Sequence, residues 1–239
     1  MGQLTELSKK YNADKYELGY MPHYESNFSS LKDSTIKILE IGIALGDSQK
    51  MWLEYFPNAT VYGMDSFYSS SHPRHRQVCE QFTTSMQNNP HRDRFISFDG
   101  DQENETDLNN FLNQHGNEFD IIIDDGGHTM RQHQISLKVL FKALKPGGLY
   151  VIEDLHTCSG QWDMLYGRKT IANRDTITTD LLKSFETPNE QQYSETNYID
   201  ETTMSYIKNN IKTCSIETCV HNYKDYIWPT SLAFIQKKL

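Results

Sequence analysis

Two short acidic segments of the chain carry residues that could do chemistry. One is Asp124-Asp125-Gly126-Gly127-His128 and the other is Glu153-Asp154-Leu155-His156. Each segment ends an apolar run that is typical of a buried strand, at 118–125 and 148–154. Adjacent parallel strands lie about 4.8 Å apart and end at the same edge of a sheet, so we expect these carboxylates to converge on one point.

The pattern of acids predicts a metal site. Three carboxylates this close would repel one another and raise their pKa values unless a cation joined them. A set of oxygen ligands suits a hard ion such as Mg²⁺, with waters or substrate hydroxyls completing its octahedron. We therefore predict that Asp125, Glu153 and Asp154 bind Mg²⁺ or another hard divalent metal, whereas Asp124 is interpreted as a structural residue of the turn.

His128, three residues after Asp125, is the candidate general base. It would lie at the start of the following helix, close to a hydroxyl at the metal site. Neutral imidazole can take a proton near pH 7, and such a transfer contributes about 10² to 10⁴ in rate. A lone histidine is more often a surface or hydrogen-bonded residue, and for His156 that structural reading has at least equal weight.

A turn between two glycines follows the first apolar run and is a candidate cofactor loop. The run at 36–42 is too short for a helix, and Gly42 and Gly46 bound the turn. In a doubly wound sheet, this first turn lets the backbone approach a ligand closely. Glu40 and Asp65, at the ends of the first two strands, would flank a nucleoside-sized cavity, and the Asp65 carboxylate suits the two ribose hydroxyls.

A nicotinamide oxidoreductase would use the same geometry, and a lone Gly-x-x-x-Gly also fits an ordinary tight turn. Two residues count against a dinucleotide. The glycine that lets the pyrophosphate approach is replaced by Ala44, and Glu40 would repel the pyrophosphate. A cationic sulfonium amino acid tolerates this acid.

Alternation of apolar and amphipathic segments predicts the fold. Parallel strands are expected at 36–42, 59–65, 94–101, 118–125 and 148–154. The helix at 47–56 would be capped by Asp47 or Ser48 and would carry Met51, Trp52, Tyr55 and Phe56 on its inner face. The helix at 130–145 would end in a turn at Pro146-Gly147-Gly148, and its inward-facing side chains would be Ile135, Leu137, Val139, Leu140 and Leu144. The tail indicates two strands joined by a turn at Trp228-Pro229. We expect an α/β, Rossmann-like, doubly wound seven-stranded sheet, mostly parallel, with an antiparallel C-terminal edge pair.

Length and charge favour one catalytic domain over residues 1–239. Residues 1–34 would form a helical cover and 155–210 a cap, and the aromatic residues Trp162, Tyr166 and Trp228 could line an acceptor pocket. With 23 basic and 32 acidic residues, the formal charge of −9 argues against nucleic acid as a partner. The sequence shows no membrane span or targeting segment, and its four scattered cysteines suit reduced thiols in the cytoplasm.

Short motifs along most of the chain resemble the metal-dependent sugar O-methyltransferases of macrolide biosynthesis, such as the mycinamicin and macrocin enzymes. The motifs are Lys10–Lys15, Gly19-Tyr20, Leu39–Gly42, Gly63–Asp65, Gly100–Gln102, Asp124–His128, Leu144–Gly148 and Glu153-Asp154. The resemblance implies an S-adenosylmethionine-dependent O-methyltransferase with the metal ligands and base named above. It also implies that Glu40 and Asp65 hold the methionine and ribose parts of the cofactor, and that Asp101 and Gln102 lie near its adenine.

The resemblance has departures that leave the acceptor open. The extra N-terminal domain of some of these enzymes is not expected here, and their common DDGSH is DDGGH at 124–128. A hydroxyl of a sugar or another small molecule would fit, and so would a homo-oligomer. The alternatives are a nicotinamide oxidoreductase, an iron- and oxygen-dependent hydroxylase of the same fold group, and a non-catalytic S-adenosylmethionine-binding protein.

Overall fold

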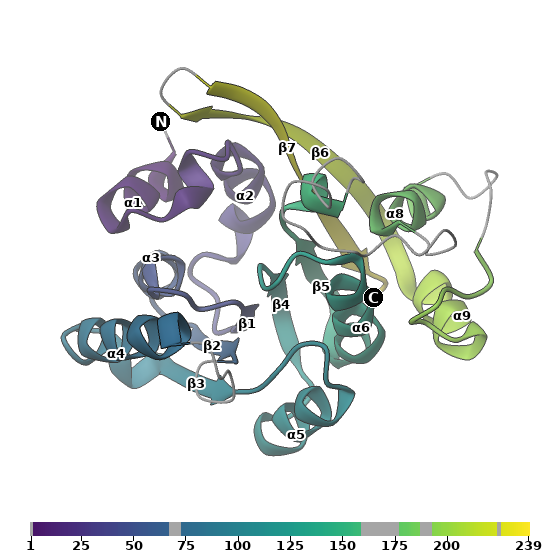
Figure 1. Ribbon diagram of the computed structural model, residues 1–239, viewed down its shortest axis with the longest axis horizontal. Helices are drawn as coiled ribbons and strands as arrows, with labels where there is room; N and C mark the ends of the chain where they lie inside the picture. Colours follow the sequence, from purple (N-terminus) through teal and green to yellow (C-terminus); the bar gives the residue numbers. More distant parts are fainter. Residues whose placement is uncertain (1, 67–72, 159–176, 187–192, 224–225) are drawn as a thin grey trace. The chain divides into compact units, whose positions relative to one another are not determined.

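The computed structural model describes residues 2–66, 73–158, 177–186, 193–223 and 226–239 (Figure 1). These residues divide into two compact units. The first unit comprises 1–101 and 219–229, and the second comprises 102–218 and 230–239. Among the described residues, no helix is both long and apolar enough to cross a bilayer. That the chain acts as one catalytic domain stays a prediction.

The first unit contains three parallel strands in the order β3-β2-β1. They are β1 (Lys37–Ile41), β2 (Thr60–Asp65) and β3 (Phe95–Asp99). Every residue of β1 after the first is buried, as expected for a strand covered on both faces. Ile41 pairs with Met64, and Asp65 pairs with Asp99, so the three strands end near one another.

The helix after β1 follows its glycine turn directly. Helix α3 (Asp47–Tyr55) has Gly46 as its N-cap, with a φ of 77° and no side-chain cap. The predicted cap by Asp47 or Ser48 is therefore wrong, because Asp47 pairs with Lys50 and the Ser48 hydroxyl bonds to Glu40. The predicted inner face is confirmed, since Met51, Trp52, Tyr55 and Phe56 are all buried.

The N-terminal residues form the helices that the sequence predicts for 1–34. They are α1 (Gln3–Tyr11), η1 (Asp14–Tyr16), α2 (Met21–Phe28) and η2 (Ser29–Leu31). Helix α1 packs on α3 (Figure 1). An aromatic cluster joins α2 to α3. In that cluster Trp52 lies 5.2 Å from Tyr24 and 5.8 Å from Phe28, measured between ring centroids. The unit also contains α4 (Pro73–Gln87) and η3 (Arg92–Arg94).

The second unit contains the central parallel pair that the strand-end acids require. Strand β4 (Phe119–Asp124) pairs with β5 (Leu144–Ile152), and β7 (Tyr226–Lys237) pairs with β5 in the antiparallel sense. Its helices are α5 (Glu105–His115), α6 (Met130–Leu140) and η4 (Phe141–Ala143). The apolar side chains predicted to face inward from 130–145 are buried.

The turn predicted at Pro146-Gly147-Gly148 is wrong. Helix α6 ends at Leu140, and these three residues lie inside β5. The strand accommodates them as an irregularity: its register with β4 shifts between Phe119 and Ile121, and Gly147 adopts a φ of 79°. The Gly147 N–H donates to the Lys238 carbonyl at 3.1 Å, so the segment is held as part of the sheet.

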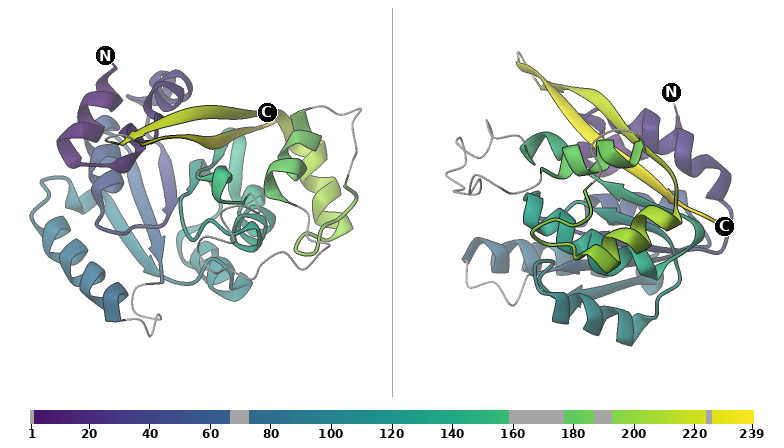
Figure 2. Two further views of the ribbon diagram at one scale, coloured as in Figure 1. Left: turned by 45° about the horizontal axis from the view of Figure 1, so that its top comes forward. Right: turned by 90° about the vertical axis from the view of Figure 1, so that its right-hand side faces the viewer.

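The tail forms the expected antiparallel pair, but its turn lies elsewhere. Strands β6 (Ile211–Tyr223) and β7 (Tyr226–Lys237) run side by side (Figure 2), and Trp228-Pro229 lies within β7. The predicted turn at these residues is therefore wrong. A proline has no N–H to donate to a neighbouring strand. It fits here because β5 pairs with β7 only from Ala233 to Gln236, so β5 has no carbonyl opposite Pro229 that would accept a hydrogen bond.

The described residues therefore form seven strands, with β3-β2-β1 in the first unit and β4-β5-β7-β6 in the second, apart from the ends of β6 and β7 within 219–229, which belong to the first. The expected Rossmann-like sheet, parallel apart from its C-terminal pair, is confirmed. Within the predicted cap, the described residues form η5 (Leu155–Cys158), α8 (Thr178–Glu186) and α9 (Glu201–Asn210). Helices α8 and α9 pack on α6, and the predicted pocket aromatics Trp162 and Tyr166 lie outside the described residues.

The aromatic cluster of the first unit predicts a large loss of stability on truncation. Phe28→Ala removes a fully buried ring that contacts Tyr24 and Trp52, and we expect the free energy of unfolding to fall by about 3–5 kcal/mol. Denaturant unfolding followed by tryptophan fluorescence measures it. Ser26→Ala, an exposed position on the same helix, is the control and should change stability by less than about 0.5 kcal/mol. Equal stability of the two variants would contradict the packing described here.

Candidate active site and metal centre

The strand register of the second unit places the acidic segments at one edge. Asp124 is the last residue of β4 and pairs with Ile152, the last residue of β5. The backbone N–H of Glu153 donates to the Asp124 carbonyl at 3.0 Å and continues the pairing by one residue. Asp125 and Asp154 therefore leave neighbouring strands at the same level.

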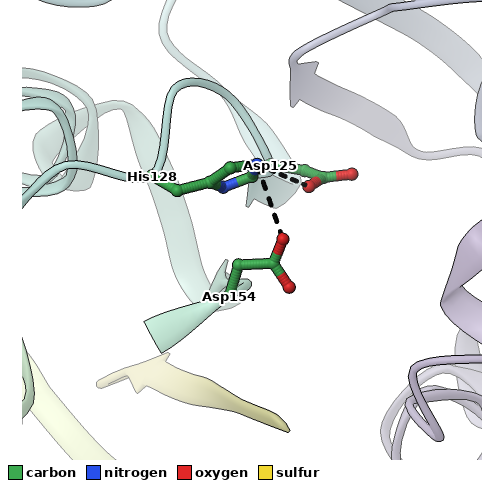
Figure 3. A group of neighbouring side chains, drawn as sticks. All are labelled: Asp125, His128 and Asp154. Carbon is green, nitrogen blue, oxygen red and sulfur yellow. Dashed lines mark ion pairs between the residues drawn. The ribbon is translucent and has the colours of Figure 1, made fainter. Parts of the chain in front are cut away.

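Asp125, His128 and Asp154 converge in space (Figure 3). The His128 Nε2 atom lies 4.0 Å from an Asp125 oxygen and 3.5 Å from an Asp154 oxygen. One ligand atom from each of the three residues lies within 4.8 Å of the other two. All three side chains are partly exposed, so a small molecule or ion can reach them.

Glu153 lies beside this group but is fully buried. One of its carboxylate oxygens lies within 4.8 Å of an Asp125 oxygen. Carboxylates grouped in this way fit a hard divalent cation, which prefers oxygen ligands. The structure thus brings Asp125 together with His128 and Asp154, and it places the Glu153 carboxylate near Asp125 but not within that group of three. The metal-binding and base roles of these residues stay predictions.

The backbone at two of these residues adopts an uncommon conformation. His128 has a φ of 57° and Asp154 a φ of 53°, both in the left-handed region. For residues other than glycine this conformation costs about 1–2 kcal/mol, and it persists only where surrounding contacts impose it. Such residues concentrate at functional sites, and here they aim the imidazole and the carboxylate toward each other.

Asp124 has the structural environment that its turn position suggested. It is fully buried, and the Gln102 side-chain amide donates to its Oδ1 at 3.0 Å. Burial raises the pKa of Asp124 to about 6, and hydrogen bonds from Gln102 and Ser136 oppose this rise. The Gln102 oxygen also accepts the Gly127 N–H at 2.7 Å. Asp124 and Gln102 therefore hold the loop that carries Asp125 and His128.

The local structure explains why position 127 is glycine, although the motifs of the related enzymes have serine there. A Cβ atom at this position would lie 2.1 Å from the Gln132 side chain. That side chain accepts the Thr129 N–H at 3.1 Å and completes a capping box at the start of α6. Glycine at 127 thus leaves room for the glutamine that caps the helix.

His133 is a site neighbour that sequence reasoning missed. It lies on α6, fully buried, with its ring centroid 6.4 Å from that of His128. Burial lowers the pKa of His133 to about 3, and proximity to His128 acts in the same direction. The residue is therefore neutral at pH 7. Only its spacing of one helical turn from the apolar Leu137, which is buried, could have indicated that it faces inward.

The predicted cofactor loop lies in the first unit and is held by Asp65. One Asp65 oxygen accepts the N–H groups of Ile43 and Ala44, at 2.8 and 3.2 Å. Gly42, Ala44 and Gly46 all have positive φ. At Gly46, a Cβ would lie 2.6 Å from the Phe82 ring, so the turn can be this tight only with glycine. Asp65 thus fixes the loop that it was predicted to flank.

Glu40 has partners that the sequence did not reveal. It is fully buried, and one of its oxygens accepts from the Ser48 hydroxyl, the Gln49 amide and the Trp52 indole, at 2.9, 2.6 and 3.1 Å. Its other oxygen lies 3.2 Å from the Lys15 ammonium, which is also fully buried. This ion pair connects the Lys10–Lys15 motif to β1. A cofactor contact by Glu40 remains a prediction.

The remaining predicted residues are less informative. Asp101 is exposed, next to Gly100, whose N–H donates to the Asp65 carbonyl at 3.0 Å. His156 is half-buried on η5. The Trp228 side chain lies outside the described residues.

Comparison with known proteins gives a consistent set of relatives. No protein-family model matches the chain. The 8-demethyl-8-(2-methoxy-alpha-L-rhamnosyl)-tetracenomycin-C 3'-O-methyltransferase of Streptomyces olivaceus is 34% identical over 195 residues, 77% of this chain and 44% of that enzyme. The demethylmacrocin O-methyltransferase of Streptomyces fradiae is 31% identical over 190 residues, 76% of this chain and 43% of that enzyme. The chain spans less than half the length of these curated relatives.

A solved structure extends the comparison to nearly all of the chain. The MycE methyltransferase of the mycinamycin pathway, in complex with Mg, SAH and mycinamycin VI, matches with a TM-score of 0.67 and 26% identity. The match covers 99% of this chain and 55% of MycE. Over the length that they share, the chain is thus related to the sugar O-methyltransferases of macrolides and tetracenomycins, as its motifs predicted.

Proposed function

We propose that this chain is an S-adenosylmethionine-dependent, Mg²⁺-assisted O-methyltransferase that acts on a hydroxyl of a sugar or another small molecule. The observation that carries the proposal is the convergence of Asp125, His128 and Asp154 at the ends of β4 and β5. This cluster occurs in a chain related to enzymes named as sugar O-methyltransferases and to a structure that holds Mg and SAH.

In this proposal, Asp125, Glu153 and Asp154 hold the metal, which would supply a Lewis acid that lowers the pKa of the acceptor hydroxyl. His128 takes the hydroxyl proton on Nε2, the atom that faces both aspartates. The acceptor oxygen then bonds to the cofactor's methyl carbon as the bond from that carbon to sulfur breaks, and S-adenosylhomocysteine leaves.

The first unit would contribute the cofactor contacts. The loop from Gly42 to Gly46 lets the backbone approach a ligand, and the second Asp65 oxygen would accept from the ribose hydroxyls. Glu40 and Asp101 keep the methionine and adenine roles implied by the resemblance, and Gln102, which belongs to the second unit, keeps its adenine role as well. For Glu40, the contacts described above indicate that the residue also orders the loop.

The acceptor class and the location belong to the same proposal. The excess of acidic residues supports a small-molecule acceptor over a nucleic acid. The cytoplasmic location expected from the scattered cysteines is part of the same proposal. A homo-oligomer would be compatible with this proposal.

Removal of the proposed base should separate chemistry from binding. His128→Ala should lower kcat by about 10²- to 10⁴-fold because no group remains to take the hydroxyl proton. Transfer of labelled methyl from S-adenosylmethionine to a panel of glycosides measures it, and calorimetry should show unchanged cofactor affinity. His91→Ala, a half-exposed histidine of the first unit, is the control. Full turnover by His128→Ala would remove the base assignment.

Loss of one proposed ligand should weaken the metal. Asp125→Asn removes a carboxylate charge with little change in shape, and we expect about 100-fold weaker Mg²⁺ binding, or ~2.7 kcal/mol. Chelator should abolish turnover by the unchanged protein. Asp120→Asn is the matched control, because Asp120 is a partly exposed carboxylate on β4, the strand that Asp125 follows, and it pairs with Lys145. Metal affinity that is equal in both variants, or turnover that survives chelator, would contradict the metal site.

A further inference from the structure

Thr157 joins the two loops that carry the proposed base and metal ligands. Its hydroxyl oxygen lies 2.9 Å from the His128 carbonyl oxygen and 2.8 Å from the Asp154 carbonyl oxygen, so the two carbonyls share its one hydrogen as acceptors. Its backbone N–H also donates to the Asp154 carbonyl, at 2.9 Å. One residue of η5 thus contacts the backbone of both loops, although His128 and Thr157 are 29 positions apart in the chain.

The two carbonyls that Thr157 contacts belong to residues with an uncommon backbone conformation. His128 and Asp154 are two of the four residues other than glycine that have positive φ among the described residues. This conformation needs outside contacts to persist, and a hydrogen bond to the carbonyl of such a residue fixes its peptide plane. Because the peptide plane sets where the side chain points, the Thr157 hydroxyl acts on the directions of the imidazole and the carboxylate.

The distance between the His128 and Asp154 side chains also bears on the role of the Thr157 hydroxyl. The His128 Nε2 atom lies 3.5 Å from the Asp154 oxygen, although the two residues follow different strands. The sheet fixes each loop where its strand ends, at Asp124 and Ile152, but His128 is four residues beyond that point. A contact past the end of the sheet is therefore required to hold it, and Thr157 supplies one.

We propose that Thr157 is a positioning residue: its hydroxyl holds His128 and Asp154 in the geometry needed for metal binding and proton transfer. The inference rests on the function proposed above for those two residues. Thr157 itself is not assigned a contact with substrate, metal or cofactor. Residues that orient metal ligands in this indirect way typically change metal affinity or activity about 10- to 100-fold when altered.

The test compares two substitutions that differ in the hydroxyl. Thr157→Val keeps the branched shape and loses the donor, whereas Thr157→Ser keeps the donor and loses the methyl group. We expect Thr157→Val to bind Mn²⁺ about tenfold more weakly by calorimetry and to lower kcat by about 10- to 100-fold. S-adenosylmethionine affinity should stay within about twofold of the unchanged protein, because its predicted contacts are elsewhere. Thr157→Ser should keep the Mn²⁺ affinity and the kcat of the unchanged protein, because it keeps the hydroxyl donor.

Thr83→Val is the matched control, since Thr83 also donates its hydroxyl to a backbone carbonyl, at 2.8 Å, but within α4 of the first unit. It should leave metal affinity unchanged. If valine prevents folding at 157, as judged by circular dichroism, Thr157→Ala compared with Thr157→Ser asks the same question. Unchanged metal affinity and kcat in the folded variant without the hydroxyl would overturn the inference, and so would a serine variant as impaired as valine. An unchanged protein that binds no metal would instead overturn the proposed metal site, and the inference with it.

Discussion

The parallel pairing of β4 with β5 is the constraint on which the candidate site depends. Because Asp124 pairs with Ile152, the residues that follow the two strands emerge together. Asp125, Glu153 and Asp154 follow the ends of neighbouring strands for that reason. A shift of one residue in this register would turn alternate side chains to the other face of the sheet and disperse the carboxylates. The buried apolar sequences of both strands fix the register, so the fold and the acidic cluster have one origin.

The two sets of acids differ in how their charge is balanced. Glu40 is fully buried, and a buried lysine and three hydrogen-bond donors surround its carboxylate. Such an environment stabilises a fixed charge and orders the loop that follows. Asp125 and Asp154 are instead partly exposed, and their oxygens lie 4.0 and 3.5 Å from Nε2 of the His128 imidazole. Carboxylates held close together and open to solvent are suited to receive a cation, which is the physical basis for placing the metal there.

Local sequence patterns predicted much of this structure because each pattern that identifies a strand or the acidic cluster spans only a few consecutive residues. Apolar runs located the strands, and the acids at their ends located the cluster, since each signal lies within a few residues. The errors arose where distant contacts override local chemistry. Pro146-Gly147-Gly148 resembles the end of a helix, yet these residues lie in β5, where the Gly147 N–H donates to the distant Lys238 carbonyl. Trp228-Pro229 resembles a turn, yet the limited pairing of β5 lets proline remain in β7. The partnership of Lys15 with Glu40 and the bridge made by Thr157 have no local signature, because each joins segments separated along the chain.

Binding of S-adenosylmethionine tests the central claim most directly. Calorimetric titration of the cofactor into the folded protein, with Mg²⁺ and then with chelator, requires no knowledge of the acceptor. We predict micromolar binding in both conditions, because the cofactor contacts are assigned to the glycine loop and Asp65 and not to the metal ligands. Absence of binding in both conditions, by a protein shown to be folded, would contradict the account and make a nicotinamide cofactor the next ligand to titrate.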